Sequence, residues 1–175
     1  MPTRQTLPTI WLFTDRRMGE ALWSAIERVP SGGGVMLRHH GSDVALGERV
    51  AAACAVRGLM LAVAGDGELA RRVGAEMVHN PDREADGLLI SRSVHDRREA
   101  EAARSATLVF VSPVFATQSH PGAEPLGIER ALVLAKQAGV PAIALGGMDE
   151  ARGEAAIRAG FHGWGAIDSW LKSPA

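Results

Sequence analysis

The sequence of 175 residues carries 19 Lys and Arg against 20 Asp and Glu, and 46% of its residues are hydrophobic. This length predicts a single domain over residues 1–175, and the apolar share excludes a disordered chain. The balanced charge excludes the basic field that nucleic-acid or acidic membrane binding needs. One cysteine excludes an internal disulfide or a cysteine-rich zinc site, and the absence of tyrosine excludes chemistry that needs a phenol.

The N-terminal segment has one short apolar run, residues 10–13. A signal peptide needs about 7–15 apolar residues in this position and a membrane helix about 20. We therefore expect a cytoplasmic protein without a membrane partner. The sequence leaves the oligomeric state open, a homo-oligomer included.

Short apolar runs alternate with alanine-rich helical segments along the chain. Most of the runs are continuously apolar, which is typical of strands buried on both faces. Asp96 with Glu99 fits a capping box, Asp149 fits a helix cap, and Gly58 and Gly139 stand just past helix ends. The predicted strands are residues 10–14, 35–38, 59–64, 76–79, 88–91, 108–112, 142–145 and 163–167, and the predicted helices are residues 19–28, 46–57, 68–73, 96–104, 128–138 and 150–159.

Strands that alternate with helices predict an α/β protein with a parallel sheet. Eight units favour a closed (β/α)8 TIM barrel, and an open doubly wound sheet is the alternative. With 175 residues for eight units, or about 22 per unit, the barrel is compact and has short loops. The gap between residues 79 and 88 is too short for a proper fourth helix, so we expect that helix to be missing or vestigial.

The site of such a barrel lies at the carboxyl ends of its strands. The sequence places cations, hydroxyls and glycines there, and these groups bind phosphate. The glycine pair after the seventh strand is either a phosphate site or a tight turn, and residues 112–127 form either a loop around an anion or a stiffened surface loop. The polar residues and glycines at the strand ends are Asp15, Arg38, His39, His40, Asp66, His79, Asn80, Ser91, Arg92, Ser93, His95, Ser112, Thr117, Ser119, His120, Gly146, Gly147, Asp168 and Ser169.

Several other residues have a structural interpretation. His79 is expected to be a hydrogen-bonded histidine of the core or rim rather than a ligand. Cys54 stands in the middle of a predicted helix and is expected to be buried and inert. A metal site made by the neighbouring His39 and His40 is not expected, because adjacent strand residues point to opposite faces.

The segment of residues 111–122 (VSPVFATQSHPG) resembles the signature loop of the thiamine phosphate synthase family, which includes the thiazole tautomerase branch. Further segments resemble the family in the same order: residues 11–15 (WLFTD), 35–40 (VMLRHH), 91–95 (SRSVH), 142–148 (AIALGGM) and 159–167 (AGFHGWGAI). The resemblance covers nearly the whole chain and implies a TIM barrel.

The resemblance implies an enzyme that joins an aminopyrimidine diphosphate to a thiazole phosphate and releases pyrophosphate, usually with Mg²⁺. Its partners would then be small phosphorylated heterocycles. Asp66 is the candidate metal ligand. By position, the pyrophosphate would be surrounded by Arg38, His40, Ser93, Thr117, Ser119 and His120, and the thiazole phosphate by Gly146, Gly147, Ile167 and Asp168.

The sequence also departs from the family pattern. Histidine replaces lysine at His40 and His120, and Ala64-Gly65 stands where the family has Asn-Asp, with Asp66 one place later. Asp168 replaces a serine at the phosphate end, and Pro113 replaces the histidine of the tautomerase branch, whose proton transfer proline cannot perform. A binding or sensing module for a thiamine precursor, without catalysis, is therefore the alternative to the enzyme, and a different reaction on a phosphorylated small molecule is a third.

Overall fold

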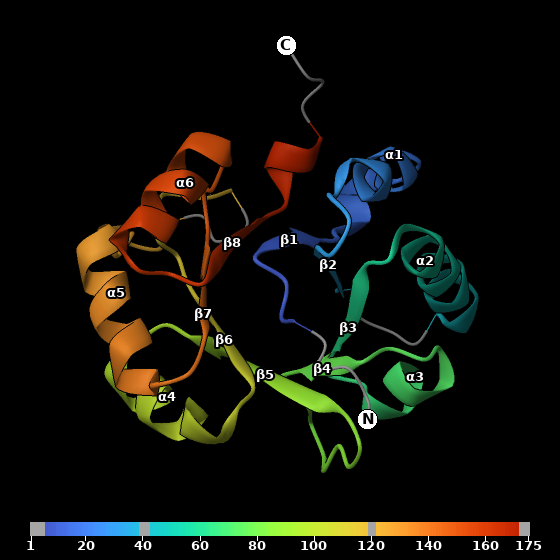
Figure 1. Ribbon diagram of the computed structural model, residues 1–175, viewed down its shortest axis with the longest axis horizontal. Helices are drawn as coiled ribbons and strands as arrows, with labels where there is room; N and C mark the ends of the chain where they lie inside the picture. The colour runs from blue at the N-terminus through green and yellow to red at the C-terminus, as the bar shows by residue number, and fades with distance from the viewer. Residues whose placement is uncertain (1–5, 39–42, 119–121, 172–175) are drawn as a thin grey trace.

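The computed structural model describes residues 6–38, 43–118 and 122–171. Eight parallel strands follow one another in chain order, and β1 also pairs with β8, so the sheet closes into a barrel (Figure 1). This confirms the TIM barrel and removes the open sheet. The strands are β1 (Ile10–Phe13), β2 (Gly34–Leu37), β3 (Met60–Ala64), β4 (Met77–His79), β5 (Leu89–Val94), β6 (Leu108–Val111), β7 (Ala142–Leu145) and β8 (Gly163–Ala166).

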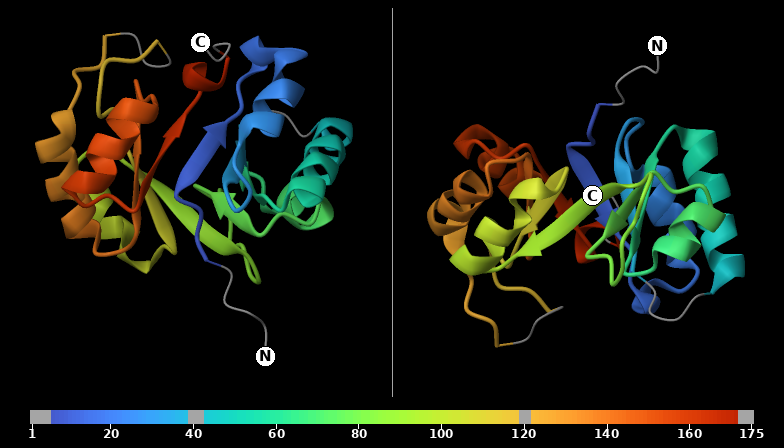
Figure 2. Two further views of the ribbon diagram at one scale, coloured as in Figure 1. Left: turned by 45° about the horizontal axis from the view of Figure 1, so that its top comes forward. Right: turned by 90° about the horizontal axis from the view of Figure 1, so that it is seen from below.

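Helices surround the strands on the outside of the barrel (Figure 2). They are α1 (Ala21–Arg28), α2 (Val44–Arg57), α3 (Gly67–Arg72), α4 (Arg97–Ala102), α5 (Gly127–Ala138) and α6 (Glu150–Ala159). Residues 80–88 connect β4 to β5 without a helix, which confirms the missing helix. In the part of the chain that the structure describes, no helix is long and apolar enough to cross a membrane.

Local capping explains where several helices begin and end. The Asp96 carboxylate accepts a hydrogen bond from the Glu99 amide (2.8 Å), which confirms Asp96 as the cap of α4. The reciprocal hydrogen bond of the predicted capping box is shifted by one residue, because the Glu99 carboxylate accepts from the His95 amide (2.7 Å). Asp149 caps α6, as predicted. Strand β5 is longer than the predicted residues 88–91, since it continues to Val94 and carries Ser93 on the strand itself.

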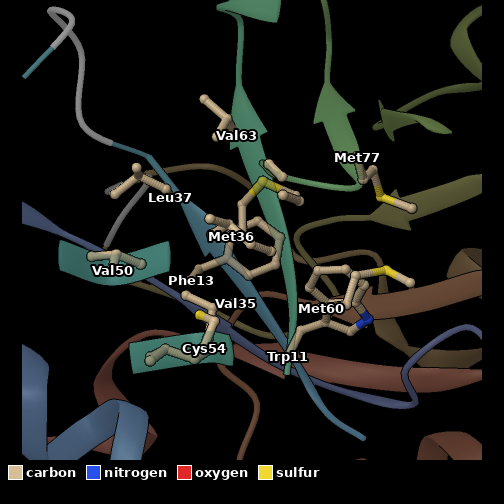
Figure 3. Close-up of a cluster of buried hydrophobic side chains, with 14 of the residues drawn as sticks. Trp11, Phe13, Val35, Met36, Leu37, Val50, Cys54, Met60, Val63 and Met77 are labelled. Carbon is tan, nitrogen blue, oxygen red and sulfur yellow. The ribbon is translucent and has the colours of Figure 1, made fainter. Parts of the chain in front are cut away.

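Bulky side chains fill the barrel interior, among them Trp11 and Phe13 of β1, which Figure 3 shows, and Phe110 of β6. The Trp11 ring contacts Phe110 edge to face at 5.4 Å between centroids, and Phe110 contacts Phe13 in the same way at 4.9 Å. Trp11 stands opposite Gly34 in the β1–β2 register, and a Cβ atom on that glycine would lie 2.5 Å from the indole ring. The glycine therefore provides the space that the tryptophan occupies.

The interface between β2 and α2 forms a second part of the core. Figure 3 shows Val50 and Cys54 of α2 facing the side of β2 that carries Val35 and Leu37. Cys54 is buried, and burial raises the pKa of its thiol to about 12. The thiol therefore stays protonated at neutral pH, which agrees with the predicted inert role.

We expect Gly34→Ala to destabilise the barrel, because the added methyl group overlaps the fully buried Trp11 ring. Overpacking of this kind costs about 1–3 kcal/mol. Urea unfolding followed by circular dichroism measures the change. Gly67→Ala is the control, because its added Cβ atom would meet no atom closer than 3.8 Å. Equal stability of the two variants would contradict this account of the Gly34 position.

Candidate functional site

A pocket opens at the carboxyl ends of β2, β6, β7 and β8, the end of the barrel at which the sequence predicts the site. The pocket contains six of the ten residues that the family resemblance assigns to the two phosphate groups, and these six come from four strand ends. The lining residues are Arg38, Ser112, Pro113, Thr117, Leu145, Gly146, Gly147, Met148, Ala166, Ile167 and Asp168. The predicted site residues His40, Ser119 and His120 lie outside the described residues.

Gly146 and Gly147 follow β7 with φ angles of +96° and +61°, in the region that favours glycine. A Cβ atom on Gly146 would lie 2.8 Å from Pro113 Cα, and one on Gly147 would collide with the Ala116 carbonyl oxygen. The pair is therefore a tight turn that lets the loop after β6 approach closely. Neither glycine amide donates a hydrogen bond to another described residue, so both are available to a ligand oxygen.

A chain of alternating charges borders this pocket at the ends of β1, β2 and β8. The Asp15 carboxylate accepts a hydrogen bond from the Arg17 side chain at 2.9 Å and lies 3.8 Å from the Arg38 guanidinium. The Arg17 hydrogen bond, opposed by burial, holds the pKa of Asp15 below its ordinary value. Arg17 also contacts the Asp168 carboxylate at 3.4 Å. The negative charge that Asp168 brings to the pocket is therefore paired with a cation.

Arg17 is a residue of the site that the sequence did not reveal. Asp15 and Arg17 are close in sequence, but Asp168 is 151 residues away from Arg17. The pair forms because β1 and β8 are neighbours in the closed barrel. The signal that was present is the run Asp15-Arg16-Arg17 directly after the first predicted strand.

A buried histidine, His79, lies at the end of β4, away from the strands that carry the glycine turn. His79 is 6% exposed, with Nδ1 3.0 Å from Ser91 Oγ and Nε2 3.0 Å from Ser93 Oγ. Its ring also packs edge to face against Phe13 and Phe110. Burial, together with the positive charges of Arg38 and Arg92, lowers the pKa of His79 to about 3. The prediction of a hydrogen-bonded core histidine is confirmed.

The predicted metal ligand Asp66 lies outside the glycine-lined pocket. Its carboxylate accepts a hydrogen bond from the Leu69 amide at 2.9 Å and so caps α3. Asp82 and Glu84 line the same open pocket as Asp66. Within residues 6–38, 43–118 and 122–171, no three His, Cys, Asp or Glu side chains are placed to hold a metal ion. These residues fit a Mg²⁺ ion only if it takes most of its ligands from water and from phosphate oxygens.

Residues 11–169 match the family model described as thiamine monophosphate synthase. A protein of Aquifex aeolicus, named putative thiamine-phosphate synthase 2, is 26% identical over 95% of this chain and 99% of its own. A putative thiamine-phosphate synthase of Geobacter sulfurreducens is 29% identical over 95% of this chain and 88% of its own.

Solved structures show the same fold. Thiamine phosphate pyrophosphorylase from Pyrococcus furiosus superposes with a TM-score of 0.79 at 20% identity, over 95% of this chain and 88% of that one. The thiamine phosphate pyrophosphorylase of Bacteroides thetaiotaomicron gives a TM-score of 0.63 at 19% identity, over 96% and 87% of the two chains. At these identities the structures support the barrel fold alone.

The neutral state of His79 predicts a dependence of stability on pH. The unfolded chain takes up a proton on this histidine near pH 6.5, whereas the folded chain does so only near pH 3. Between these values the unfolded state binds more protons, so folding stability decreases as the pH is lowered, by roughly 1 kcal/mol per pH unit. Urea unfolding at pH 7, 6, 5 and 4 measures this slope.

The matched variants for this test are His79→Gln and His162→Gln. His79→Gln removes the titrating group, so its stability should change less between pH 7 and pH 4 than that of the wild type. His162 is only partly buried, and its replacement should leave the slope unchanged. An identical slope in wild type and His79→Gln would show that the buried histidine is protonated in the fold.

Because Arg17 pairs with Asp168, we expect removal of the one charge and removal of the other to change anion affinity in opposite directions. Asp168→Asn should strengthen the binding of inorganic phosphate about two- to fivefold, and Arg17→Ala should weaken it by a similar factor, as expected for partly exposed charges. Isothermal titration calorimetry at low salt measures both. Glu101→Gln is the control, because it removes an exposed carboxylate of an ion pair on α4. If Asp168→Asn binds phosphate no better than Glu101→Gln does, Asp168 does not face the bound anion.

Proposed function

Because the chain belongs to the thiamine monophosphate synthase family, we propose that it joins an aminopyrimidine diphosphate to a thiazole phosphate and releases pyrophosphate. The observation that carries the proposal is the pocket at the barrel mouth. It combines one arginine with two glycine amides that have no partner among the described residues. A pocket of this composition suits two phosphorylated substrates that meet end to end.

The glycine turn is proposed to hold the thiazole phosphate. Gly146 and Gly147 offer backbone amides, and Ile167 lies across the same pocket at the end of β8. Backbone amides gathered around a concave site bind anions without bringing a mobile charge. Asp168 is tolerated there because Arg17 compensates its charge.

Arg38 is proposed to bind the diphosphate. Its guanidinium lies over the Phe13 ring at 5.9 Å, and its side chain is held on one side by Asp15. Burial lowers the pKa of Arg38, but arginine keeps its charge at neutral pH. A partly desolvated guanidinium interacts more strongly with an incoming phosphate than an exposed one does. Thr117 lines the same pocket and is proposed to contact the same group.

The reaction is a substitution at the methylene carbon of the pyrimidine. The bond between this carbon and the diphosphate oxygen breaks, and its electron pair leaves with the diphosphate. The lone pair of the thiazole nitrogen then forms the new carbon–nitrogen bond. No proton has to move, so the protein contributes by aligning the two rings and by stabilising the charge on the departing diphosphate at Arg38.

A Mg²⁺ ion bound with the diphosphate would neutralise part of its charge as it leaves. Asp66 is the carboxylate proposed to reach such an ion. The rest of its ligands would come from water and substrate, as Mg²⁺ commonly requires. The predicted contacts of the diphosphate with His40, Ser119 and His120 remain untested, because these three residues lie outside the described residues.

A non-catalytic binding module is the second candidate function. The observation in its favour is the absence, among the described residues, of three side chains placed to hold a metal. Such a module would bind thiazole phosphate or thiamine phosphate equally well with and without Mg²⁺, and it would form no product.

A single-turnover assay decides between the two. Purified protein is mixed with aminopyrimidine diphosphate, thiazole phosphate and Mg²⁺, and thiamine phosphate is measured with and without a chelator. We expect product only with the metal. Arg38→Ala should lower the rate about 10²-fold or more, because it removes a cation that stabilises the leaving charge. Arg72→Ala is the control, since it removes an exposed arginine on α3.

Two results would contradict the proposal. Tight binding of thiazole phosphate without any product would establish the binding module. Full activity of Arg38→Ala would remove Arg38 from the diphosphate site, whatever the overall reaction proves to be.

A further inference from the structure

The two carbonyl oxygens of the glycine turn have hydrogen-bond partners outside the pocket. Gly146 O accepts a hydrogen bond from the Phe115 amide at 3.0 Å. Gly147 O accepts one from Nη1 of Arg152, which stands in the first turn of α6. Gly146 and Gly147 line the pocket, whereas Phe115 and Arg152 do not. The turn is therefore held by groups that lie outside the pocket.

The direction of each carbonyl group fixes the direction of the next amide. Both peptide bonds are trans, and in a trans peptide the N–H group points opposite to the C=O group. The Gly146 carbonyl therefore sets the direction of the Gly147 N–H, and the Gly147 carbonyl sets that of the Met148 N–H. Neither N–H group donates a hydrogen bond to another described residue. Two consecutive amides thus point away from Phe115 and Arg152, and their residues both line the pocket.

The Arg152 guanidinium is itself held by its neighbours. Its Cζ atom lies over the Phe115 ring, 4.6 Å from the centroid, and its Nε atom lies 3.9 Å from the Asp149 carboxylate. The other oxygen of this carboxylate caps α6 by accepting a hydrogen bond from the Arg152 amide at 2.9 Å. A guanidinium that is restrained in this way loses little further freedom when it donates to the Gly147 carbonyl.

The two glycines make an outside restraint important. Glycine lacks a Cβ atom and adopts many backbone conformations, so the peptide groups that follow Gly146 and Gly147 rotate easily. The first of these peptides is held by the backbone of Phe115, which no change of the Phe115 side chain to another L-residue except proline removes. The second is held by the side chain of Arg152. The direction of the Met148 N–H therefore depends on a side chain that substitution can remove.

We infer that Arg152 is a positioning residue for anion binding in this pocket. Through the Gly147 carbonyl it directs the Met148 N–H toward the anion, and it does so without contacting the anion itself. Amides that are oriented before binding hold a phosphate group more tightly, because binding does not have to restrict their rotation. The inference deepens the proposed function and rests on it for the identity of the phosphorylated substrate, whereas the orientation of the turn does not.

An attraction of anions by the positive charge of Arg152 alone leads to a different expectation. A charge acts on the whole pocket, so its loss would weaken the contacts of both amides with the anion. Loss of the hydrogen bond to the Gly147 carbonyl instead acts on the Met148 amide. The Gly147 amide is spared, because the Gly146 carbonyl keeps its bond to Phe115. The two amides therefore distinguish the two roles.

The first experiment follows both amides by NMR spectroscopy. Inorganic phosphate is titrated into ¹⁵N-labelled wild type, Arg152→Ala and the control Arg158→Ala, which removes an exposed arginine from the same helix. In wild type and control, the amide protons of Gly147 and Met148 should both shift downfield. In Arg152→Ala, Gly147 should keep its shift and Met148 should lose most of it. The Kd for phosphate should rise about three- to tenfold in this variant.

Three results would overturn the inference. The Met148 shift could be the same in Arg152→Ala as in wild type, the shifts of Gly147 and Met148 could decrease equally, or neither amide could shift in wild type. Misfolding is a small risk, because the Arg152 side chain is half exposed and alanine favours the helix. Circular dichroism and urea unfolding establish that Arg152→Ala is folded before phosphate is added.

The second experiment connects Arg152 to the proposed reaction. In the turnover assay, Arg152→Ala should raise KM for thiazole phosphate about three- to tenfold and leave kcat and KM for aminopyrimidine diphosphate unchanged, as expected for a loss of binding at one substrate only. A lower kcat with both KM values unchanged would contradict this role. If wild type forms no product, the proposed function fails, and the phosphate titration still decides whether Arg152 positions the Met148 amide.

Discussion

A closed barrel of eight short strands must fill its own interior, and Trp11 is the side chain on which this filling depends. Its ring packs against Phe110 on the far side and is received by Gly34 on the neighbouring strand. Gly165 of β8 stands opposite Trp11 on the other side, where a Cβ atom would lie 3.2 Å from the tryptophan Cβ. Large side chains on β1 thus require small ones on both neighbours. The strand ends that carry the polar residues are fixed in space by this closure.

The closed arrangement explains why two different groups of polar residues lie at the same end of the barrel. On the side of β7 and β8, backbone amides and the compensated charge of Asp168 face the pocket. On the side of β4 and β5, the buried His79 ring lies between the hydroxyl groups of Ser91 and Ser93. Arg38 lies between them, directly after β2, and contacts Asp15 and Phe13.

Much of the fold could be predicted from the sequence, because continuously apolar runs of four or five residues recur between helical segments that have clear ends. The helix caps at Asp96 and Asp149 depend on neighbours within a few residues, and both were found. The predicted end of the fifth strand at Ser91 was wrong. Residues 92–94 continue the strand because Ser93 and Val94 pair with Phe110 and Val111 of β6, which local propensity does not reveal.

The candidate site was predictable where a residue type alone carries the property, as for the glycine turn and Arg38. It was not predictable where the property arises from partners that the barrel brings together. Arg17 meets Asp168 because the first and last strands are neighbours, and His79 is oriented because β4 and β5 align it with Ser91.

The seam where β1 meets β8 has a consequence for spectroscopy. Trp164 pairs in register with Ile10, Trp170 stacks on Trp164 with 5.9 Å between ring centroids, and the Trp170 indole nitrogen donates a hydrogen bond to the Trp11 carbonyl oxygen. The sequence has four tryptophans and no tyrosine. Three of the four indoles thus lie along one line of the barrel, and no phenol emission overlaps theirs. The intrinsic fluorescence of this protein is therefore chiefly a report on whether its first and last strands are joined.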